Sequence, residues 1–251
     1  MPTKITGEAD LRVNRYKDLG YSTFFNARTG FFARVPEPGK SEPFWSPHGP
    51  ELMDISITNW CDKGCVFCYK SSTRHGLHMA LSDYKRVIDQ AADMGTFQVA
   101  LGGGNPNQHP DFVEILNYTW SKGVVPNYTT NGRGLTEDIL AATRRNCGAV
   151  AVSAYPPYRE TAETIRLLTE NGVKTNVHFI IDSESVNTAI DWLRDPPEFL
   201  KAINALIFLN YKPSGRKVFE DKLLRHSDRL DVFFELATSS EARLKDGFDA
   251  C

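Results

Sequence analysis

Long hydrophobic runs are missing from this sequence of 251 residues. Its longest apolar runs, such as "ALIFL" at 205–209, are far shorter than the roughly 20 apolar residues that a helix needs to cross a bilayer. The first residues, "MPTKITGEADLRVNRYKDLG", are too polar for the apolar segment of a secretory signal peptide. We therefore expect a cytoplasmic protein that has no membrane partner.

A large excess of one charge is also missing. The chain carries 29 Lys and Arg residues against 31 Asp and Glu residues, a net charge of −2, so no overall positive field attracts nucleic acid. Cysteine is scarce, and five cysteines are an odd number that suits a framework of paired disulfides poorly. Because thiols stay reduced in the cytoplasm, a tight group of cysteines there points to metal binding.

From residue 52 onward, short apolar runs rich in β-branched residues alternate with amphipathic stretches. Strands are predicted at 52–58, 97–101, 124–130, 149–155, 174–181 and 205–211, with helices between and after them. The alternation predicts parallel strands joined by right-handed crossovers. A complete (β/α)8 barrel would need two more units. The expected fold is therefore α/β, either a doubly wound sheet or, as we favour, a partial (β/α)6 TIM-like barrel.

The predicted helices have recognisable ends. Cys147 falls near the end of the third helix and is expected to be a buried apolar side chain. The residues expected at helix ends are the N-caps Ser82, Thr136 and Ser227, the first helical residue Pro110, and the terminating glycines Gly95, Gly123 and Gly172.

Residues 1–50 differ from the rest of the chain. "YSTFFNARTGFFARV" at 21–35 has aromatic-rich runs around "NARTG" and predicts a β-hairpin. "PEPGKSEPFWSPHGP" at 36–50 is a proline-rich connector. We expect three parts: the hairpin and connector at 1–50, the barrel core at 51–238, and a C-terminal tail at 239–251.

Three of the five cysteines, Cys61, Cys65 and Cys68, lie close together in "NWCDKGCVFCYK" (59–70), directly after the first predicted barrel strand. The carboxyl ends of the strands are where both candidate architectures gather their chemistry. Buried apolar cysteines seldom cluster in a loop beside charged residues such as Asp62 and Lys63. The pattern therefore favours a metal site.

Two kinds of metal site fit three neighbouring cysteines. A structural zinc ion needs four ligands, and His75 or His78 would supply the fourth. A [4Fe–4S] cluster held by three thiolates keeps one iron without a protein ligand, which is typical of a catalytic site. The single run of cysteines favours the cluster, because common zinc sites use two separated cysteine pairs.

The pattern C-x3-C-x2-C, with the aromatic Phe67 before its last cysteine, resembles the signature of the radical S-adenosylmethionine (radical SAM) superfamily. The resemblance implies that Cys61, Cys65 and Cys68 bind a [4Fe–4S] cluster whose open iron chelates S-adenosylmethionine. It also implies an external electron donor, such as flavodoxin or ferredoxin. The product would be a 5′-deoxyadenosyl radical that abstracts hydrogen from a substrate, with Phe67 near the adenine.

Three further segments resemble the family pattern, each beside the end of a predicted strand. They are "GGGNPNQHPDF" (102–112), "TTNG" (129–132) and "YKPSGR" (211–216). Asn105 departs from the pattern, since the family usually has glutamate there; its amide would still accept a hydrogen bond from the ammonium group of the ligand. The residues that the resemblance assigns to the S-adenosylmethionine site are Phe67, Gly102, Gly103, Gly104, Asn105, Thr130, Ser153 and His178.

The C-terminal segment "KDGFDAC" (245–251) bears on the substrate. It resembles the Gly-Phe-Asp-(Ser/Ala)-Cys stretch that opens a cysteine-rich, SPASM-type extension in peptide-modifying radical SAM enzymes. The tail, ending on Cys251, is therefore interpreted either as a naturally short or truncated version of that extension or as the end of a fragment. The implied substrate is a ribosomally made peptide or protein. The N-terminal hairpin would cover the side opening of the partial barrel or bind a leader peptide by strand addition.

Two alternatives stay open at this point. One is a radical SAM enzyme that acts on a nucleotide, a tRNA or a small cofactor precursor, although the net charge disfavours tRNA. The other is a zinc- or cluster-binding module that catalyses nothing.

Overall fold

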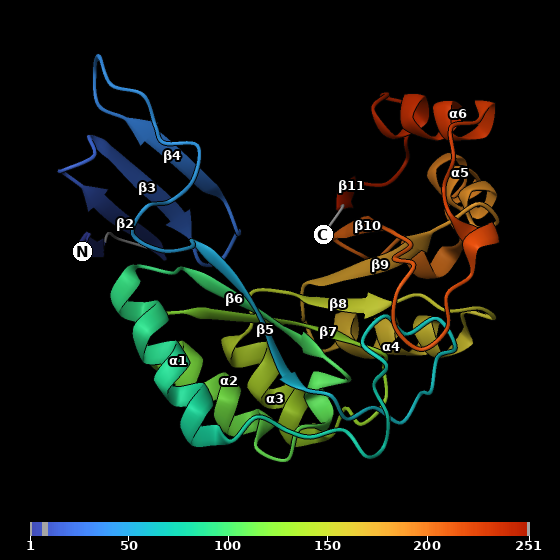
Figure 1. The fold of residues 1–251 in the computed structure, drawn as a ribbon, viewed down its shortest axis with the longest axis horizontal. Coiled ribbons are helices and arrows are strands. Elements are labelled where there is room, and N and C mark those ends of the chain that lie inside the picture. The colour runs from blue at the N-terminus through green and yellow to red at the C-terminus, as the bar shows by residue number, and fades with distance from the viewer. Residues whose placement is uncertain (1, 7–9, 250–251) are drawn as a thin grey trace.

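The computed structural model describes residues 2–6 and 10–249, which form two β-sheets and six α-helices. A four-stranded antiparallel sheet occupies the N-terminal part, and a seven-stranded parallel sheet with helices packed against it occupies the rest (Figure 1). The parallel sheet has the order β11-β10-β9-β8-β7-β6-β5, so β5 and β11 are its edges. The predicted α/β class and partial barrel are confirmed, with one strand more than expected.

The six predicted barrel strands are present, with ends that shift by one or two residues. Side chains alternate between the two faces of the sheet. In β9, Val177 and Phe179 are buried, and Phe179 contacts Trp192 of α5, whereas Asn176 and His178 are partly exposed on the inner face. The strands are β5 (Leu52–Thr58), β6 (Gln98–Gly103), β7 (Val125–Thr130), β8 (Val150–Ser153), β9 (Thr175–Ile181) and β10 (Ala205–Asn210).

The main hydrophobic core lies between the parallel sheet and its helices, and Ile57, Tyr84 and Leu101 are fully buried in it. The helices are α1 (Leu81–Met94), α2 (Phe112–Ser121), α3 (Glu137–Asn146), α4 (Arg159–Glu170), α5 (Val186–Arg194) and α6 (Asp228–Ala237). Short 3-10 turns lie at η1 (Pro106–Gln108), η2 (Glu198–Leu200) and η3 (Glu220–Lys222).

Most of the predicted helix ends are confirmed. The hydroxyls of Thr136 and Ser227 accept hydrogen bonds from backbone N–H groups of α3 and α6, and Gly95 ends α1 in a left-handed conformation. Cys147 directly follows α3 and packs against the main core, where burial raises the pKa of its thiol.

Two predicted helix starts are wrong. Ser82 is not a cap, because α1 begins at Leu81, whose side chain packs against the core, and residue 80 takes the cap position. Pro110 precedes α2 rather than starting it. The N–H of Asp111 donates to Nδ1 of His109 at 3.0 Å, and this turn delays the helix to Phe112.

The predicted hairpin is present as β3 (Tyr21–Asn26) and β4 (Phe32–Pro36), which pair antiparallel. It belongs to a larger sheet, with β1 (Thr3–Thr6) and β2 (Leu11–Tyr16) added at the side of β3. The N-terminal extension is therefore a four-stranded sheet, not a hairpin alone.

The N-terminal sheet packs at the amino ends of the barrel strands. Asn14 Nδ2 donates to the carbonyl oxygen of Gly95 at 2.7 Å, shortly before β6. Phe25 stacks on Phe97 in the same region, with ring centroids 5.2 Å apart. Lys174 Nζ donates to the carbonyl oxygen of Arg28 at 3.0 Å, shortly before β9. The sheet is thus held at the end of the strands opposite to the cysteine segment, which follows the carboxyl end of β5 (Figure 1).

The C-terminal tail is partly built into the barrel. Residues of β11 (Asp246–Asp249) run parallel to β10, with Asp246 opposite Leu206. The tail predicted at 239–251 therefore supplies a seventh strand, which its short glycine-containing sequence did not reveal. Cys251 lies outside the described residues.

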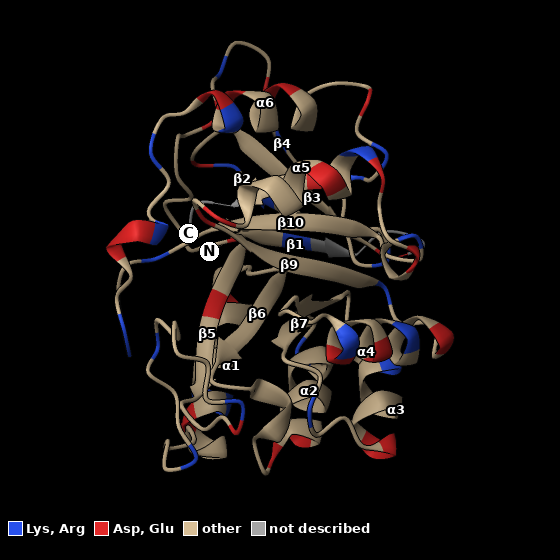
Figure 2. Ribbon diagram, turned by 90° about the vertical axis from the view of Figure 1, so that its right-hand side faces the viewer, with Lys and Arg blue, Asp and Glu red and all other residues tan. Residues whose placement is uncertain are grey.

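Acidic and basic residues are interspersed over the helices and loops in Figure 2, as the small net charge leads one to expect. Within residues 2–6 and 10–249, no helix combines the length and the apolar character needed to cross a bilayer.

The cap of α3 gives a first test. Thr136→Ala removes the oxygen that accepts from the N–H of Ile139, so we expect the free energy of unfolding in urea to fall by about 1 kcal/mol. Ser82→Ala is the matched control, because Ser82 caps nothing, and its effect should stay within about 0.5 kcal/mol. Equal losses in the two variants would contradict the assigned cap.

Candidate active site

The cysteine segment, residues 59–80, leaves the carboxyl end of β5 and is fastened to the loop that follows β6. The N–H of Gly104 donates to the carbonyl oxygen of Thr58 at 2.6 Å, and the N–H of Asn105 donates to that of Trp60 at 2.9 Å. The N–H of Cys61 donates to the carbonyl oxygen of Thr73 at 2.9 Å, which folds the segment back on itself. Backbone bonds therefore fix the base of the segment.

Two different physical reasons explain why glycine stands at the positions around the end of β6. A Cβ on Gly103 would overlap the carbonyl oxygen of Thr58, and a Cβ on Gly104 would overlap that of Trp60. Gly102 is different, because a Cβ there would meet no atom within 4 Å. Gly103 and Gly104 are needed for the close approach of two backbones, whereas Gly102 borders open space on the inner face.

The far side of the cysteine segment is held by the loop after β10. The N–H of Arg216 donates to the carbonyl oxygen of Cys68 at 3.0 Å, and Arg216 Nη1 donates to that of Cys65 at 2.8 Å. The other guanidinium nitrogen donates to the carbonyl oxygen of Ser72. Gly215 has φ of +91°, and a Cβ there would overlap Cys68 and Tyr69. The predicted segment 211–216 thus holds, by hydrogen bonds, the backbone that carries two of the cysteines.

The three cysteines are free thiols of intermediate exposure. Burial, and next the negative charges that Cys61 and Cys68 would carry, raise the pKa of the Cys65 thiol, while Lys63 lowers it. Cys65 is therefore within electrostatic reach of the other two thiols. Asn131 Nδ2 also donates to Cys61 Sγ over 3.5 Å. Among the described residues, no three His, Cys, Asp or Glu side chains already stand in a ligating arrangement.

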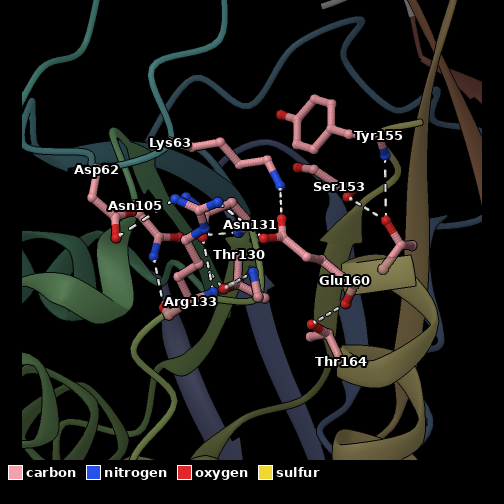
Figure 3. Close-up of polar contacts among 12 residues, drawn as sticks. Asp62, Lys63, Asn105, Thr130, Asn131, Arg133, Ser153, Tyr155, Glu160 and Thr164 are labelled. Atoms are coloured by element: carbon pink, nitrogen blue, oxygen red, sulfur yellow. Dashed lines mark hydrogen bonds and ion pairs between the residues drawn. The ribbon is translucent and has the colours of Figure 1, made fainter. Parts of the chain in front are cut away.

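A cluster of charged side chains, which sequence reasoning missed, ties the cysteine segment to β7 and α4 (Figure 3). Glu160, in the first turn of α4, accepts from Lys63 Nζ and, at 2.9 Å, from Arg133 Nη2. Hydrogen bonds from Lys63 first, and then from Arg133, lower the pKa of Glu160. Arg133 also lies 4.0 Å from Asp62, and Lys63 Nζ lies 5.0 Å from the centroid of the Tyr155 ring.

Asn105 and Thr130, two predicted contacts of S-adenosylmethionine, are each only 1% exposed. Asn105 Nδ2 donates to the carbonyl oxygen of Arg133 at 3.0 Å, and its Oδ1 accepts from the N–H of Asn131 at 3.0 Å. Thr130 donates to Asn107 Oδ1 at 2.7 Å. Their polar groups are used to brace the loops after β6 and β7 against each other.

Alternation along β7 explains the position of Thr130. It shares a face with the buried Tyr128, whose ring contacts Phe112 of α2 at a centroid distance of 5.0 Å. Thr129 lies on the opposite, inner face and is partly exposed. The sequence segment was well placed, but the neighbouring threonine is the one directed to the inner face.

The other predicted site residues come together at the inner face. Ser153 at the end of β8 lies opposite His178 of β9, and both are partly exposed. Phe67 contacts Tyr155, with ring centroids 5.7 Å apart. The cysteine segment thus turns one aromatic side chain inward, toward the residues that follow β8.

The histidines considered as zinc ligands are placed differently. His78 Nδ1 lies 2.9 Å from Thr58 Oγ1, and its ring packs edge-on against His109 at 4.9 Å. Burial and the charge of His109 lower the pKa of His78. His75 is exposed. The side chain of His78 is already engaged by Thr58 and His109, which disfavours zinc.

A separate cavity of about 530 Å³ opens between α5, η3 and α6. Its lining mixes opposite charges, with Glu220 and Asp221 beside Arg225 and Arg229. It includes no predicted site residue. We therefore assign the candidate active site to the cysteine segment and the inner face of the sheet.

Comparison with known families and structures places the cysteine segment within a matched region. Residues 55–155 match the model of the Radical SAM superfamily. A PqqA peptide cyclase of Ruegeria pomeroyi is 32% identical over 110 residues, which cover 43% of this chain and 29% of that protein. The mycofactocin maturase MftC of Mycobacterium tuberculosis is 34% identical over 98 residues, covering 38% and 25%. The matched segment thus spans less than a third of either curated relative.

The fold is also found in solved structures. The crystal structure of SuiB from Streptococcus suis has a TM-score of 0.70 at 15% identity, covering 98% of this chain and 72% of that chain. Structures of SuiB bound to S-adenosylmethionine and to its precursor peptide SuiA have TM-scores of 0.62 and 0.64 at 18% identity. They cover 80% of this chain and 51% and 49% of theirs. At sequence identities of 15% and 18%, the structural similarity supports the assignment of the fold alone.

The bracing amide of Asn105 gives a second test. Asn105→Asp replaces the donor to the Arg133 carbonyl with an oxygen, so we expect the free energy of unfolding of the metal-free protein to fall by about 2 kcal/mol in urea. Gln90→Glu makes the same chemical change on the exposed surface of α1 and should have little effect. A loss no greater than that of the control would show that the amide does not brace the loops.

Proposed function

We propose that the chain is a radical SAM enzyme, which cleaves S-adenosylmethionine reductively and uses the resulting radical to modify a peptide; the match of residues 55–155 to the Radical SAM superfamily model supports this. The observation that carries the proposal is the cysteine segment. Its three thiols follow the carboxyl end of β5, where barrel enzymes place their chemistry, and Cys65 lies within electrostatic reach of the other two.

The residues present fit a [4Fe–4S] cluster. Cys61, Cys65 and Cys68 would be its ligands, since the Cys65 thiol is within electrostatic reach of the other two and the backbone that carries all three is hydrogen-bonded on both sides. Asn131 would donate to the Cys61 sulfur. When bound, the cluster would supply an open iron for S-adenosylmethionine and the electron that splits its sulfonium to a 5′-deoxyadenosyl radical.

The chain's own groups would hold S-adenosylmethionine at the inner face. Gly102 leaves room for a ligand to approach the backbone, and Ser153 and His178 are polar groups on the same face. Phe67, which contacts Tyr155, would border the adenine. Gly103, Gly104, Asn105 and Thr130 would act indirectly, by fixing the loops from which these groups project.

The ion cluster around Glu160 would cover one side of this site. By binding Lys63 and Arg133, Glu160 joins the cysteine segment to α4 and to the loop after β7. The side chain of Lys63 is only 14% exposed. Limiting the access of water from this side suits radical chemistry because it reduces side reactions of the radical.

We infer a peptide substrate from the relatives. Two of them are a PqqA peptide cyclase and a mycofactocin maturase, and a protein of similar fold binds its precursor peptide. The sheet is not closed into a full barrel, since β5 and β11 are edges, and this leaves a side opening for a large substrate. The edge strand β4 of the N-terminal sheet would accept a leader segment as an added strand.

Cleavage of S-adenosylmethionine is the test of the proposal. After anaerobic reconstitution with iron and sulfide, we expect about four irons per chain and, with dithionite and S-adenosylmethionine, formation of 5′-deoxyadenosine detected by mass spectrometry. Cys65→Ala should lose iron and all product. Cys147→Ala is the matched control, because this thiol packs against the hydrophobic core, and it should keep both.

The same measurement separates the alternatives. Zinc in place of iron, or metal lost on His75→Ala and His78→Ala, would contradict the cluster. Candidate peptides, nucleotides or tRNA added to the reaction decide the substrate class. A deuterated substrate passes deuterium to 5′-deoxyadenosine, so labelling by a nucleotide and not by a peptide would overturn the peptide assignment.

The glycines give a second test of the ligand site. Gly102→Ala should leave the free energy of unfolding of the metal-free protein nearly unchanged, because the added methyl group meets no protein atom, but it should weaken S-adenosylmethionine binding about tenfold or more. Gly104→Ala should instead destabilise the metal-free protein, because its Cβ overlaps the Trp60 carbonyl. Unchanged affinity in Gly102→Ala, measured by equilibrium dialysis, would remove Gly102 from the site.

A further inference from the structure

The inner face of the parallel sheet changes in chemistry from one side of the sheet to the other. Toward the carboxyl ends of the strands, the inner-face residues of β5, β6, β7 and β8 are small or polar: Ser56, Gly102, Thr129 and Ser153. The inner face of β9 and β10 instead carries larger apolar residues, which are Ile180, Ile207 and Leu209. These three residues are called the inner apolar patch below.

The direction of these side chains follows from their neighbours in the chain. Phe208, which lies between Ile207 and Leu209, is buried in the main core, and so are both neighbours of Ile180. Because successive side chains of a strand point to opposite faces, the three patch residues point inward. The register places Ile207 beside His178 and Leu209 beside Ile180. The patch is therefore continuous and adjoins a residue of the proposed S-adenosylmethionine site.

The inner apolar patch takes no part in the hydrophobic cores. Within residues 2–6 and 10–249, its members belong neither to the main core nor to the small cluster around Phe25 and Phe97, and each is partly exposed. Transfer of apolar surface from water to an apolar contact is favourable, so such a patch favours an apolar occupant. An exposed apolar patch beside polar groups is also typical of a ligand-binding surface.

The two strands of the patch present no opposite charge to a charged substrate. The other inner-face residues of β9 and β10 in the described chain are Asn176, His178 and Ala205, so neither strand places Lys, Arg, Asp or Glu there. A substrate carboxylate or ammonium group would lose its water on the patch without gaining an ion pair from these strands. On the next strand, Asp249 lies opposite Leu209 in register, and a basic substrate tests whether that position attracts it.

The edge strand β11 leaves room beside the patch. Gly247 lies opposite Ile207 in register, and the ring of the following residue, Phe248, contacts Phe234 of α6 on the other face at a centroid distance of 5.5 Å. A Cβ on Gly247 would meet one described atom within 4 Å, the Cδ1 atom of Ile207 at 3.4 Å. The space beside Ile207 can therefore take a side chain that enters over the edge of the sheet.

The patch reaches the same end of the sheet as the cysteine segment. The N–H of Ala154 donates to the carbonyl oxygen of His178 at 2.8 Å, so the chain after β8 still runs beside β9, and Tyr155 follows at the level of Ile180. The ring of Tyr155 contacts Phe67 of the cysteine segment at a centroid distance of 5.7 Å and lies beside Ser153 in Figure 3. A C–H bond held on the patch would thus face the side from which a radical formed at the cluster arrives.

We propose that the inner apolar patch holds the side chain that is modified, and that this side chain is uncharged and apolar, either aliphatic or aromatic. The inference rests on the proposed function and names the class of residue within its peptide substrate. Ser153, His178 and Ile207 form one row across the sheet, so an occupant of the patch lies next to the bound S-adenosylmethionine. One substrate C–H bond breaks, its hydrogen forms a C–H bond of 5′-deoxyadenosine, and the unpaired electron stays on the substrate carbon.

The probes are three peptides of the form acetyl-Gly-Gly-Xaa-Gly-Gly-amide, in which Xaa is norleucine, lysine or glutamate. Norleucine and lysine share an unbranched chain of four carbons, so this pair isolates the effect of the ammonium group. Binding is measured by equilibrium dialysis on the reconstituted protein with S-adenosylmethionine and without dithionite. We expect the norleucine peptide to bind about tenfold or more tightly than either charged peptide.

Two variants alter the patch in different ways. Ile207→Asp should weaken binding of the norleucine peptide by about tenfold and strengthen binding of the lysine peptide. Gly247→Val keeps the apolar character but fills the space beside Ile207, so it should weaken the norleucine peptide alone; valine suits a strand, and the fold should be kept. Val232→Asp is the matched control, because it makes the same kind of change at a partly exposed apolar position of α6, and it should bind as the parent does.

Hydrogen transfer gives a second reading. With dithionite, a norleucine peptide deuterated in its side chain should pass deuterium to 5′-deoxyadenosine, detected by mass spectrometry. Binding of this peptide with unlabelled 5′-deoxyadenosine as the product would show that the patch does not hold the modified side chain.

The inference is overturned by a lysine or glutamate peptide that binds as tightly as the norleucine peptide, the lysine result assigning the selectivity to Asp249. It is also overturned if both patch variants bind as the parent does, or if the control loses as much affinity as they do. If none of the peptides binds, another part of a protein covers the patch and the inference fails. A parent that prefers the norleucine peptide but forms no 5′-deoxyadenosine contradicts the proposed function and leaves the apolar preference standing.

Discussion

The cysteine segment keeps its position because two backbone N–H groups of the loop after β6 donate hydrogen bonds to one of its carbonyl groups and to the one just before it. Thr58 and Trp60 offer the carbonyls, and Gly104 and Asn105 donate to them. A side chain on residue 103 or 104 would separate the two backbones. Everything else at the site is built on this contact: the loop after β7 rests on Asn105, and Glu160 and Arg216 then hold the segment from its other sides.

The residues that hold the segment come from most of the barrel. They follow β6, β7, β8 and β10, so the cysteines acquire their arrangement only when the parallel sheet is complete. Parallel strands need long crossovers, and their pairing joins parts of the chain that are distant in sequence. The eight-residue cysteine motif therefore depends on the complete fold for its geometry, although its own side chains supply the thiols that would bind a metal.

Much of the fold was predictable because its signals are local. Apolar runs separated by glycine and capped by threonine or serine defined six strands and six helices to within a few residues. Strands β1, β2 and β11 were not predicted: β1 and β11 have only four residues each, and half of the residues of β2 are polar. β11 gains its stability from pairing with β10 rather than from its composition. Ser82 failed as a cap because packing of Leu81 against the core moved the start of α1.

The site was predictable in its segments but not in its side-chain directions. The Cys61 to Cys68 run and the segments after β6, β7 and β10 do converge, since the carboxyl ends of parallel strands share one edge. Thr129 and Thr130 point to opposite faces of the sheet, and a shift of one residue would exchange them. The sequence alone therefore does not show which of the two is directed to the inner face. The sequence shows that three charged residues each follow a strand closely, namely Lys63, Arg133 and Glu160. Only the fold reveals that Glu160 forms ion pairs with the other two.

The two kinds of glycine after β6 would be conserved to different degrees among homologues. Gly103 and Gly104 are constrained by contact between protein backbones, so any homologue that keeps this loop geometry has to keep them, whatever it binds. Gly102 has no such internal constraint. If Gly102 borders the bound ligand, as proposed, substitutions at position 102 would accumulate first among descendants that kept the fold but no longer bind that ligand.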